Sequence, residues 1–341
     1  MTAQTDRPVL ITGGAGYIGS HAMLACLDSG RQVVVVDDLS TGRRAAVPEG
    51  VPFYHGKVED GALIGRIITD HGCRAVMHFA GFIVVPDSVA RPLDYYYNNV
   101  VASALLLRAC LDNGIEHFVF SSTAAVYDGD VADGRPLAED AALAPANPYG
   151  RGKLMTEWML RDVAAASDLR FAVLRYFNVA GADQAGRAGQ YSKDATHLIK
   201  RACQTILGAL PHIDVFGDDY PTADGTCVRD YIHVSDLAQA HVAVLDHIGN
   251  GDGNATMNCG YGHGYSVREV LDVVDQVAAD MLAAAPMTRR PAPRRAGDPA
   301  SLVADSSRIR KTLNWQPKYD DLNVMAATAL AWEKTLLDGM N

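Results

Sequence analysis

Tyr149 and Lys153 are the pair of residues in this sequence best suited to proton transfer. Pro148 precedes them, at the start of a segment with helical periodicity. A spacing of i and i+4 puts both side chains on one helical face. A free phenol, with a pKa near 10, is a poor base at neutral pH, but a neighbouring ammonium lowers that pKa. The pair predicts a phenol that takes up and returns a proton, although Y-x-x-x-K alone is also typical of amphipathic surface helices.

Three glycines predict a site for a dinucleotide. Gly13, Gly16 and Gly19 lie between an apolar strand at 9–12 and a helical segment at 21–27. The first glycine permits a tight turn, the second lets the backbone approach a pyrophosphate, and the third lets the helix pack on the strand. The helix N-terminus offers free N–H groups and a positive dipole end to phosphates. Any tight strand-to-helix turn favours glycine, so the motif depends on its context.

Asp37 indicates which dinucleotide binds. It ends a strand of four valines at 33–36, the place where an acidic residue holds a ribose 2′-hydroxyl and repels the 2′-phosphate of NADP. This favours NAD as the cofactor. Arg43 and Arg44, which follow, keep NADP open as an alternative.

The elements that position these residues alternate between short β-branched runs and helical patterns, as in parallel sheets with crossover helices. We therefore predict an α/β fold, with a Rossmann-type doubly wound parallel sheet and a smaller C-terminal α/β substrate lobe. The NAD-binding domain covers 1–180 and the substrate lobe 181–341, with a soft boundary and segments that interleave. Predicted strands cover 9–12, 33–36, 51–55, 74–79, 118–123 and 171–175, and predicted helices cover 21–27, 62–71, 93–113, 149–166, 196–210, 234–248, 267–284 and 321–337.

Composition narrows the possible partners. The 341 residues carry a net charge of −10 without a basic stripe, which argues against nucleic acid as the main partner. Six scattered cysteines without a C-x-x-C pair favour reduced core residues over disulfides or a zinc site. No apolar run reaches membrane-spanning length. We expect a cytoplasmic protein that does not act on a membrane.

Several longer motifs resemble the extended short-chain dehydrogenase/reductase family. They are TGGAGYIGSH at 12–21, FSSTAAVY at 120–127, and the Tyr149/Lys153 pair. The segments RYFN at 175–178, GTCVRDYIHV at 225–234 and PRRAGD at 293–298 narrow this resemblance to its UDP-glucose 4-epimerase branch. The resemblance covers nearly the whole chain, and the last two motifs are far more specific than the glycine turn.

The resemblance implies interconversion of UDP-glucose and UDP-galactose. Tyr149 would take the proton of the sugar 4-hydroxyl while C4 gives its hydride to NAD. The 4-keto sugar would then rotate and take the hydride back on its other face. Thr123 would hydrogen-bond the same oxygen, and Lys153 would hold the nicotinamide ribose and tune Tyr149. No metal is required.

Carried over position by position, the resemblance also implies two sets of binding residues. The cofactor set is Gly13, Gly16, Tyr17, Ile18, Gly19, Asp37, Phe79, Ala80, Gly81, Asn98, Thr123, Tyr149, Lys153 and Tyr176. The UDP-sugar set is Thr123, Tyr149, Asn178, His197, Leu198, Val215, Phe216, Arg229, Arg295, Asp298 and Leu302.

Four positions depart from the pattern of that family. Ile83 stands where many members have a lysine, and Lys57 where an aspartate commonly meets the adenine, which puts these two cofactor contacts in doubt. His197 replaces an asparagine near the substrate. Leu302 stands where a bulky tyrosine restricts some members to plain hexoses and a smaller residue admits N-acetylated sugars, so its intermediate size leaves the preferred UDP-sugar open.

Rival functions remain within and outside this branch. A 4,6-dehydratase or decarboxylase generally needs an acid directly after the Ser or Thr, but Ala124 and Ala125 follow Thr123 here. A 4-epimerase of an N-acetylhexosamine, uronic acid or pentose form of UDP-sugar is a closer alternative. A non-catalytic NAD-binding regulator would not need Thr123, Tyr149 and Lys153 together. The segments 93–113 and 149–166 are apolar on more than one face, which suggests either a dimer interface formed by this helix pair or burial within one chain, and the resemblance favours a homodimer.

Overall fold

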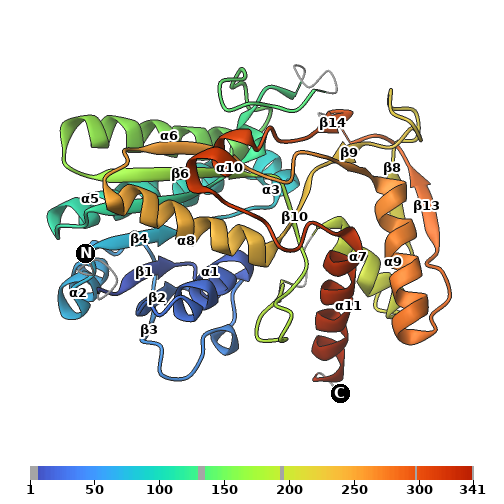
Figure 1. Cartoon of the computed structure of the whole chain (residues 1–341), viewed down its shortest axis with the longest axis horizontal. Helices are drawn as coiled ribbons and strands as arrows, with labels where there is room; N and C mark the ends of the chain where they lie inside the picture. Colours follow the sequence, from blue (N-terminus) through green and yellow to red (C-terminus); the bar gives the residue numbers. More distant parts are fainter. Residues whose placement is uncertain (1–6, 130–134, 193–195, 296–297, 340–341) are drawn as a thin grey trace.

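Seven parallel strands form the central sheet within the residues that the computed structural model describes, which are 7–129, 135–192, 196–295 and 298–339 (Figure 1). Neighbouring strands pair in parallel throughout, and β1 pairs with both β2 and β4. In spatial order the strands are β3 (Phe53–His55), β2 (Val33–Asp37), β1 (Val9–Thr12), β4 (Ala75–His78), β5 (His117–Thr123), β6 (Arg170–Tyr176) and β11 (Ala255–Cys259).

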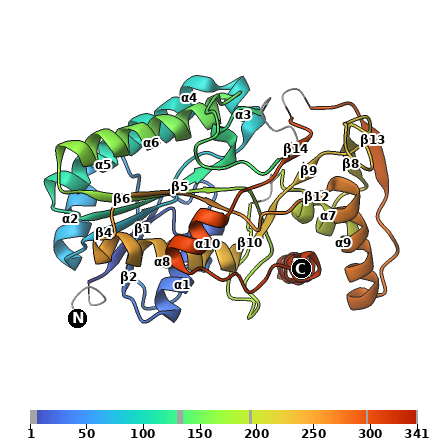
Figure 2. The same ribbon diagram turned by 45° about the horizontal axis from the view of Figure 1, so that its top comes forward.

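The central strands are buried on both faces. Every residue of β1, β2 and β5 is buried, which explains why β1 and β2 are apolar up to their last residue and do not alternate with polar residues. One helical layer packs against each face, as Figure 2 shows. This arrangement confirms the predicted Rossmann-type α/β fold. The first face carries α1 (Tyr17–Asp28) and α8 (Val234–Asn250), and the second carries α2 (Gly61–His71), α5 (Ala102–Asp112) and α6 (Pro148–Ala166).

The helical segment predicted at 93–113 is present but not uniform. It consists of α4 (Pro92–Tyr96), a π-helical turn (Tyr97–Val101) and α5. A short preceding helix, α3 (Val85–Ala90), has a proline in its first turn, where no intrahelical N–H is required. The sequence patterns predicted neither α3 nor the π turn, because both are too short to show periodicity.

The second half of the chain builds a smaller lobe and also returns to the sheet. β11 pairs with β6, and α8 packs against α1, so segments from beyond residue 180 interleave with the first domain. The boundary at 180 itself stays a prediction. The remaining elements are β7 (Asn178–Ala180), α7 (Leu198–Ile206), β8 (Ile213–Phe216), β9 (Val228–Arg229), β10 (Tyr231–His233), β12 (Tyr265–Ser266), α9 (Val267–Leu282), β13 (Arg289–Ala292), β14 (Ser301–Leu302), α10 (Ser307–Leu313), α11 (Leu322–Asp338) and the 3₁₀ turns Arg44–Ala46 and Ala124–Val126.

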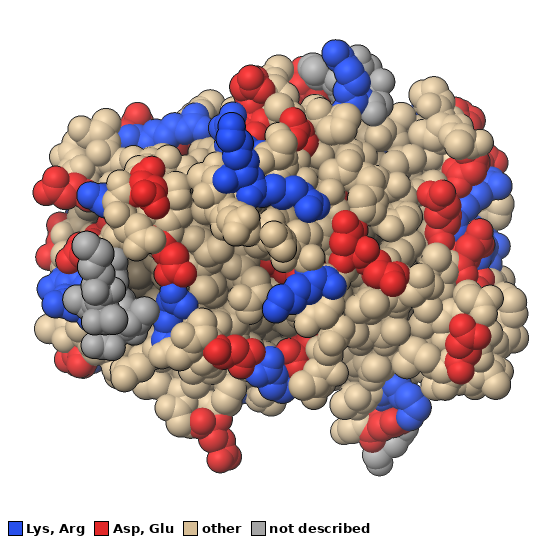
Figure 3. All heavy atoms as spheres, in the orientation of Figure 1, with Lys and Arg blue, Asp and Glu red and all other residues tan. Residues whose placement is uncertain are grey.

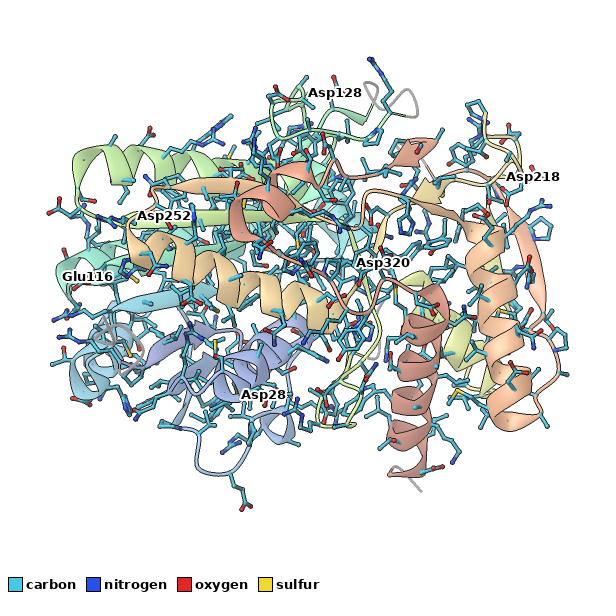
Figure 4. All side chains as sticks on the ribbon, in the orientation of Figure 1. Asp28, Glu116, Asp128, Asp218, Asp252 and Asp320 are labelled. Carbon is cyan, nitrogen blue, oxygen red and sulfur yellow. The ribbon has the colours of Figure 1, made fainter. Side chains whose placement is uncertain are left out.

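Ion pairs at the surface join the two halves. Arg187 pairs with Asp28 at the end of α1, with 2.8 Å between Nη1 and Oδ1; Asp28 is labelled in Figure 4. On the face shown in Figure 3, basic and acidic side chains are interspersed and form no single-sign stripe. Within the described parts of the chain, no helix is both long and apolar enough to cross a membrane.

Candidate active site

A cavity of about 1090 Å³ opens beyond the carboxyl ends of the central strands, between the sheet and the smaller lobe. Ligands of open α/β sheets bind at this edge. With one exception, all the residues predicted from the sequence to bind cofactor or substrate line this cavity. The exception is Val215, which packs against the main hydrophobic core, whereas its neighbour Phe216 reaches the cavity wall. Successive side chains of a strand point to opposite faces, so only one of the two can line the cavity.

The glycine turn forms one end of the cavity and has no space for side chains. Gly13 has a φ of +69°, and a Cβ there would lie 2.6 Å from the main-chain nitrogen of Ala80. A Cβ on Gly19 would lie 2.2 Å from the oxygen of Gly13. Backbone N–H groups are therefore accessible at the start of α1, as a pyrophosphate requires.

Asp37 supports this turn from the end of β2. Its carboxylate accepts hydrogen bonds from the main-chain nitrogens of Ala15, at 2.9 Å, and Leu39, at 2.8 Å. Burial nevertheless raises the pKa of the Asp37 carboxyl group. Both contacts use backbone donors, so the carboxylate is fixed between the turn and the cavity.

The two arginines that kept NADP open as an alternative do not line the cavity. Arg43 lies over the ring of Tyr191, 5.7 Å from its centroid. Arg44 donates to the main-chain oxygen of Val47 at 2.7 Å. The lysine that does line this end, Lys57, pairs with Glu59 at 3.6 Å. The geometry therefore supports NAD.

Tyr149 and Lys153 lie one turn apart on α6 and face the middle of the cavity. Asn147 caps the helix by accepting a hydrogen bond from the Gly150 nitrogen at 2.9 Å. The Lys153 ammonium donates to the main-chain oxygen of Ser121 at 2.9 Å and lies 4.9 Å from the centroid of Phe120. Burial lowers the pKa of Lys153 to about 8, which still leaves it mostly charged at neutral pH.

The phenol of Tyr149 differs from the sequence expectation. Burial raises its pKa to about 12, and a hydrogen bond with Thr123 offsets only part of this effect. Thr123 also accepts a hydrogen bond from the Ala125 nitrogen at 3.1 Å, which fixes its hydroxyl group at the end of β5. Desolvation of the phenolate thus outweighs the hydrogen bond with Thr123 in the protein alone. A further positive charge in the cavity is needed to make Tyr149 a base.

A buried ion pair holds α6 against the sheet behind these residues. Arg175 on β6 and Glu157 on α6 are both fully buried, with 2.6 Å between Nη2 and Oε2. Ser122 donates to the same carboxylate at 2.6 Å. The ends of β5 and β6 and the helix that carries Tyr149 are therefore fixed relative to one another.

Cationic and aromatic groups form the far end of the cavity. Arg229 lies 3.5 Å from Asp298 and donates to the main-chain oxygen of Pro299 at 2.9 Å. Arg295 stacks on Phe216, with its guanidinium carbon 3.9 Å from the ring centroid. This end can bind a group with several negative charges beside a flat ring.

Sequence reasoning missed some cavity residues. Arg201 lines the cavity from α7, four residues after His197. The predicted helix at 196–210 contained the signal for it, because i and i+4 share a face. Cys227 and Tyr231 also line the wall; both lie in the GTCVRDYIHV motif at 225–234, of which only Arg229 was predicted to bind substrate. Among the described residues, no three His, Cys, Asp or Glu side chains are placed to hold a metal ion together.

The parallel sheet, the glycine turn and the Tyr149/Lys153 pair define a nucleotide-binding enzyme of the Rossmann type with a second anionic ligand site. Comparison with known proteins is more specific: residues 9–260 match the NAD dependent epimerase/dehydratase family, and the chain belongs to it. It is 55% identical over 335 residues, which are 98% of this chain and 94% of its relative, to the UDP-glucose 4-epimerase of Azospirillum brasilense.

Solved structures agree. The chain is similar to UDP-glucose 4-epimerase from Bifidobacterium longum in complex with NAD+ and UDP, with a TM-score of 0.89, 38% identity, and coverage of 97% of this chain and 99% of the other. It is also similar to the UDP-Glc/GlcNAc 4-epimerase of Campylobacter jejuni, with a TM-score of 0.83, 41% identity, and coverage of 96% and 99%.

Proposed function

We propose that this protein is an NAD-dependent 4-epimerase that interconverts UDP-glucose and UDP-galactose. The observation that carries the proposal is one continuous cavity that joins the glycine turn to Arg229 and Arg295, with Tyr149 and Lys153 at its middle. The nearly full-length similarity to UDP-glucose 4-epimerases supports the same activity.

The residues around the glycine turn fit NAD. Backbone atoms pack so closely at Gly13 and Gly19 that no Cβ fits, which keeps the turn tight enough for its backbone to approach a pyrophosphate, and Asp37, which lines the same cavity, would contact the ribose. Lys153 and Tyr176 line the inner wall, where the nicotinamide end would lie. When bound, NAD supplies the reversible hydride acceptor for C4 of the sugar and a positive charge next to Tyr149.

Tyr149 is the proposed base. Its phenolate would take the proton of the sugar 4-hydroxyl and later return it, and Thr123 would hold the same oxygen in place. The buried Lys153 ammonium, one turn further along α6, would stabilise this phenolate electrostatically. Neither role requires a metal ion.

The far end of the cavity would hold the uridine diphosphate. Arg229 and Arg295 suit a diphosphate, because a guanidinium can donate two parallel hydrogen bonds to two oxygens of one phosphate group. Asn178 lies beside the same wall. Firm binding of the diphosphate together with loose binding of the hexose would let the keto sugar turn over between the two hydride transfers.

A second substrate class is supported by Leu302. This half-buried side chain lines the cavity, where it would face the hexose, and is smaller than the tyrosine that restricts some members of the family. The relative from C. jejuni is named for both UDP-Glc and UDP-GlcNAc. We therefore propose UDP-N-acetylglucosamine as the alternative substrate.

An NMR time course tests these proposals. Purified protein is incubated with UDP-galactose and no added cofactor, and in parallel with UDP-N-acetylgalactosamine. We expect UDP-glucose to appear and to reach the same equilibrium from either side. A Tyr149→Phe variant that keeps its NAD should lose turnover about 10²–10⁴-fold. Absence of conversion with added NAD would contradict the proposed activity.

We also propose a homodimer in the cytoplasm. Leu93, Tyr97, Val101 and Leu105 recur every four residues along α4, the π turn and α5, and are 79%, 54%, 43% and 43% exposed. Trp158 on the adjacent α6 is 50% exposed. Such an apolar stripe is typical of a protein–protein interface. Light scattering of a Leu93→Asp/Val101→Glu variant should show monomers, and an unchanged mass would contradict this interface.

The proposed location in the cytoplasm rests on the cysteines. All six are buried and free, which suits a reducing compartment.

A further inference from the structure

His197 is the cavity residue whose surroundings the proposed mechanism does not explain. It immediately precedes α7, and its half-buried side chain lines the wall between the smaller lobe and the sheet. It does not cap its own helix. The ring is therefore not engaged by the start of its own helix.

One ring nitrogen of His197 is already used. The amide nitrogen of Gln190 lies 2.8 Å from His197 Nδ1. An amide NH₂ group can only donate, so Nδ1 must be the unprotonated acceptor. A neutral imidazole then carries its proton on Nε2, which makes no hydrogen bond with any described residue.

Gln190 is itself fixed from behind. It is buried, and its main-chain oxygen accepts a hydrogen bond from the Lys200 ammonium at 2.8 Å. Lys200 is also buried and pairs with Glu333 of α11. This chain of contacts ties the Gln190 backbone to two helices of the smaller lobe, and so fixes the point from which the side chain extends towards His197.

The ring is kept neutral as well as oriented. Burial lowers the pKa of His197 to about 4, and the charge of Lys200 lowers it further in the same direction. Among the described residues, Lys200 of α7 is the charged group that acts on the ring, and it pairs with Glu333 of α11. Other charged residues that line the same cavity from the smaller lobe are Arg201, Asp214, Arg229, Arg295 and Asp298.

We infer that Gln190 is a positioning residue that holds His197 in its Nε2–H tautomer, so that the ring donates to a diphosphate oxygen of the bound UDP-sugar. This inference rests on the proposed function. Arg201, one turn further along α7, and the N-terminal end of this nine-residue helix favour an anion at the same place. A neutral donor adds a contact there without adding charge to a wall that already holds several cations.

The tautomer is measured first, in the NAD-loaded wild-type protein. NMR of isotope-labelled histidines reports protonation at each ring nitrogen, and His197→Asn identifies the signal. We expect the Nε2–H form without titration between pH 5.5 and 8, and a change of the Nε2 signal when UDP-glucose binds. An Nδ1–H form, or titration near pH 6.5, would overturn the inference.

Ligand affinity is measured next, by calorimetry with UDP-glucose in a Tyr149→Phe background that keeps the ligand as one species. UDP-glucose has no group that titrates between pH 5.5 and 8, so its own charge stays constant. As long as Gln190 is unchanged, the affinity of the Tyr149→Phe protein for UDP-glucose should vary less than about twofold between pH 5.5 and 8.

The decisive variant is Gln190→Glu. A carboxylate would accept the proton of Nδ1–H, remove the donor from Nε2 at pH 8, and raise the pKa of the ring. At pH 8 we expect this variant to bind UDP-glucose about tenfold more weakly than the Tyr149→Phe protein with Gln190 intact. At pH 5.5 its affinity should recover. Adding His197→Asn should abolish this pH dependence.

Gln190→Met provides a second test if the glutamate variant does not fold. It removes the hydrogen bond without adding charge and should mix the two tautomers in the NMR spectrum. Unchanged affinity and tautomer in either variant would overturn the role of Gln190. Failure of the wild-type protein to bind UDP-glucose would instead overturn the proposed function, whatever tautomer the NMR spectrum shows.

Discussion

The Lys153 ammonium lies 2.9 Å from the main-chain oxygen of Ser121, in a buried position next to the Tyr149 phenol. Its positive charge stabilises a phenolate only while the amine is protonated. Because burial lowers its pKa to about 8, we expect kcat to fall as the pH rises above 8. Because arginine stays charged throughout this pH range, the residual activity of Lys153→Arg should not fall above pH 8. A pH profile of both proteins checks this, and an identical decrease in the variant would contradict it.

Gly19→Ala should weaken the binding of NAD at least about tenfold, because a Cβ at this position would lie 2.2 Å from the Gly13 oxygen and would push the turn apart. The NAD content of purified protein and its restoration by added NAD are the measurements. Gly61→Ala is the matched control. This glycine begins α2, and its Cβ would approach no atom closer than 3.9 Å. Equal NAD content in the two variants would contradict the prediction.

Arg175→Met should lower the free energy of unfolding by about 3–5 kcal/mol, since it removes the buried partner of the Glu157 carboxylate and leaves only Ser122 and the half-exposed Arg161, at 3.6 Å. Denaturant unfolding measures the change. The double variant Arg175→Met/Glu157→Leu removes both charges and should recover much of the loss. A double variant as unstable as the sum of the two single ones would show that the ion pair is not the cause.

His241 should make the protein less stable in acid. Burial lowers the pKa of this fully buried histidine to about 4, so the unfolded chain binds the proton more readily below pH 6.5. Stability is lost as the pH falls from 6.5 towards 4, by about 2 kcal/mol between pH 7 and 5. His241→Phe should reduce this loss in pH-dependent unfolding. His55→Gln, a change at an exposed histidine, should not reduce it.

Most of the fold could be predicted from patterns within short stretches of sequence. The Gly13/Gly16/Gly19 spacing and the buried valines of β2 are short-range signals, and the strand, turn and helix form where they indicated. The i, i+4 spacing of Tyr149 and Lys153 likewise predicted their common helical face, because a helix repeats every 3.6 residues.

Contacts between distant segments could not be predicted in this way. The hydrogen bond from Gln190 to His197 depends on a loop conformation that no periodicity encodes. The raised pKa of Tyr149 depends on how deeply the assembled lobes bury it, which its neighbours in sequence do not reveal. Val215 and Phe216 were assigned the same role, and only the direction of each side chain on β8 separates them.

The return of β11 to the sheet has a consequence for synthesis of the chain. The Phe171 nitrogen at the start of β6 bonds to the Asn254 side chain across 83 residues of sequence. Until that later segment leaves the ribosome, β6 has one edge without a neighbour, and such an edge can pair with another chain. A nascent chain that stops after residue 180 should therefore aggregate, and completion of the sheet should be a late and slow event in folding.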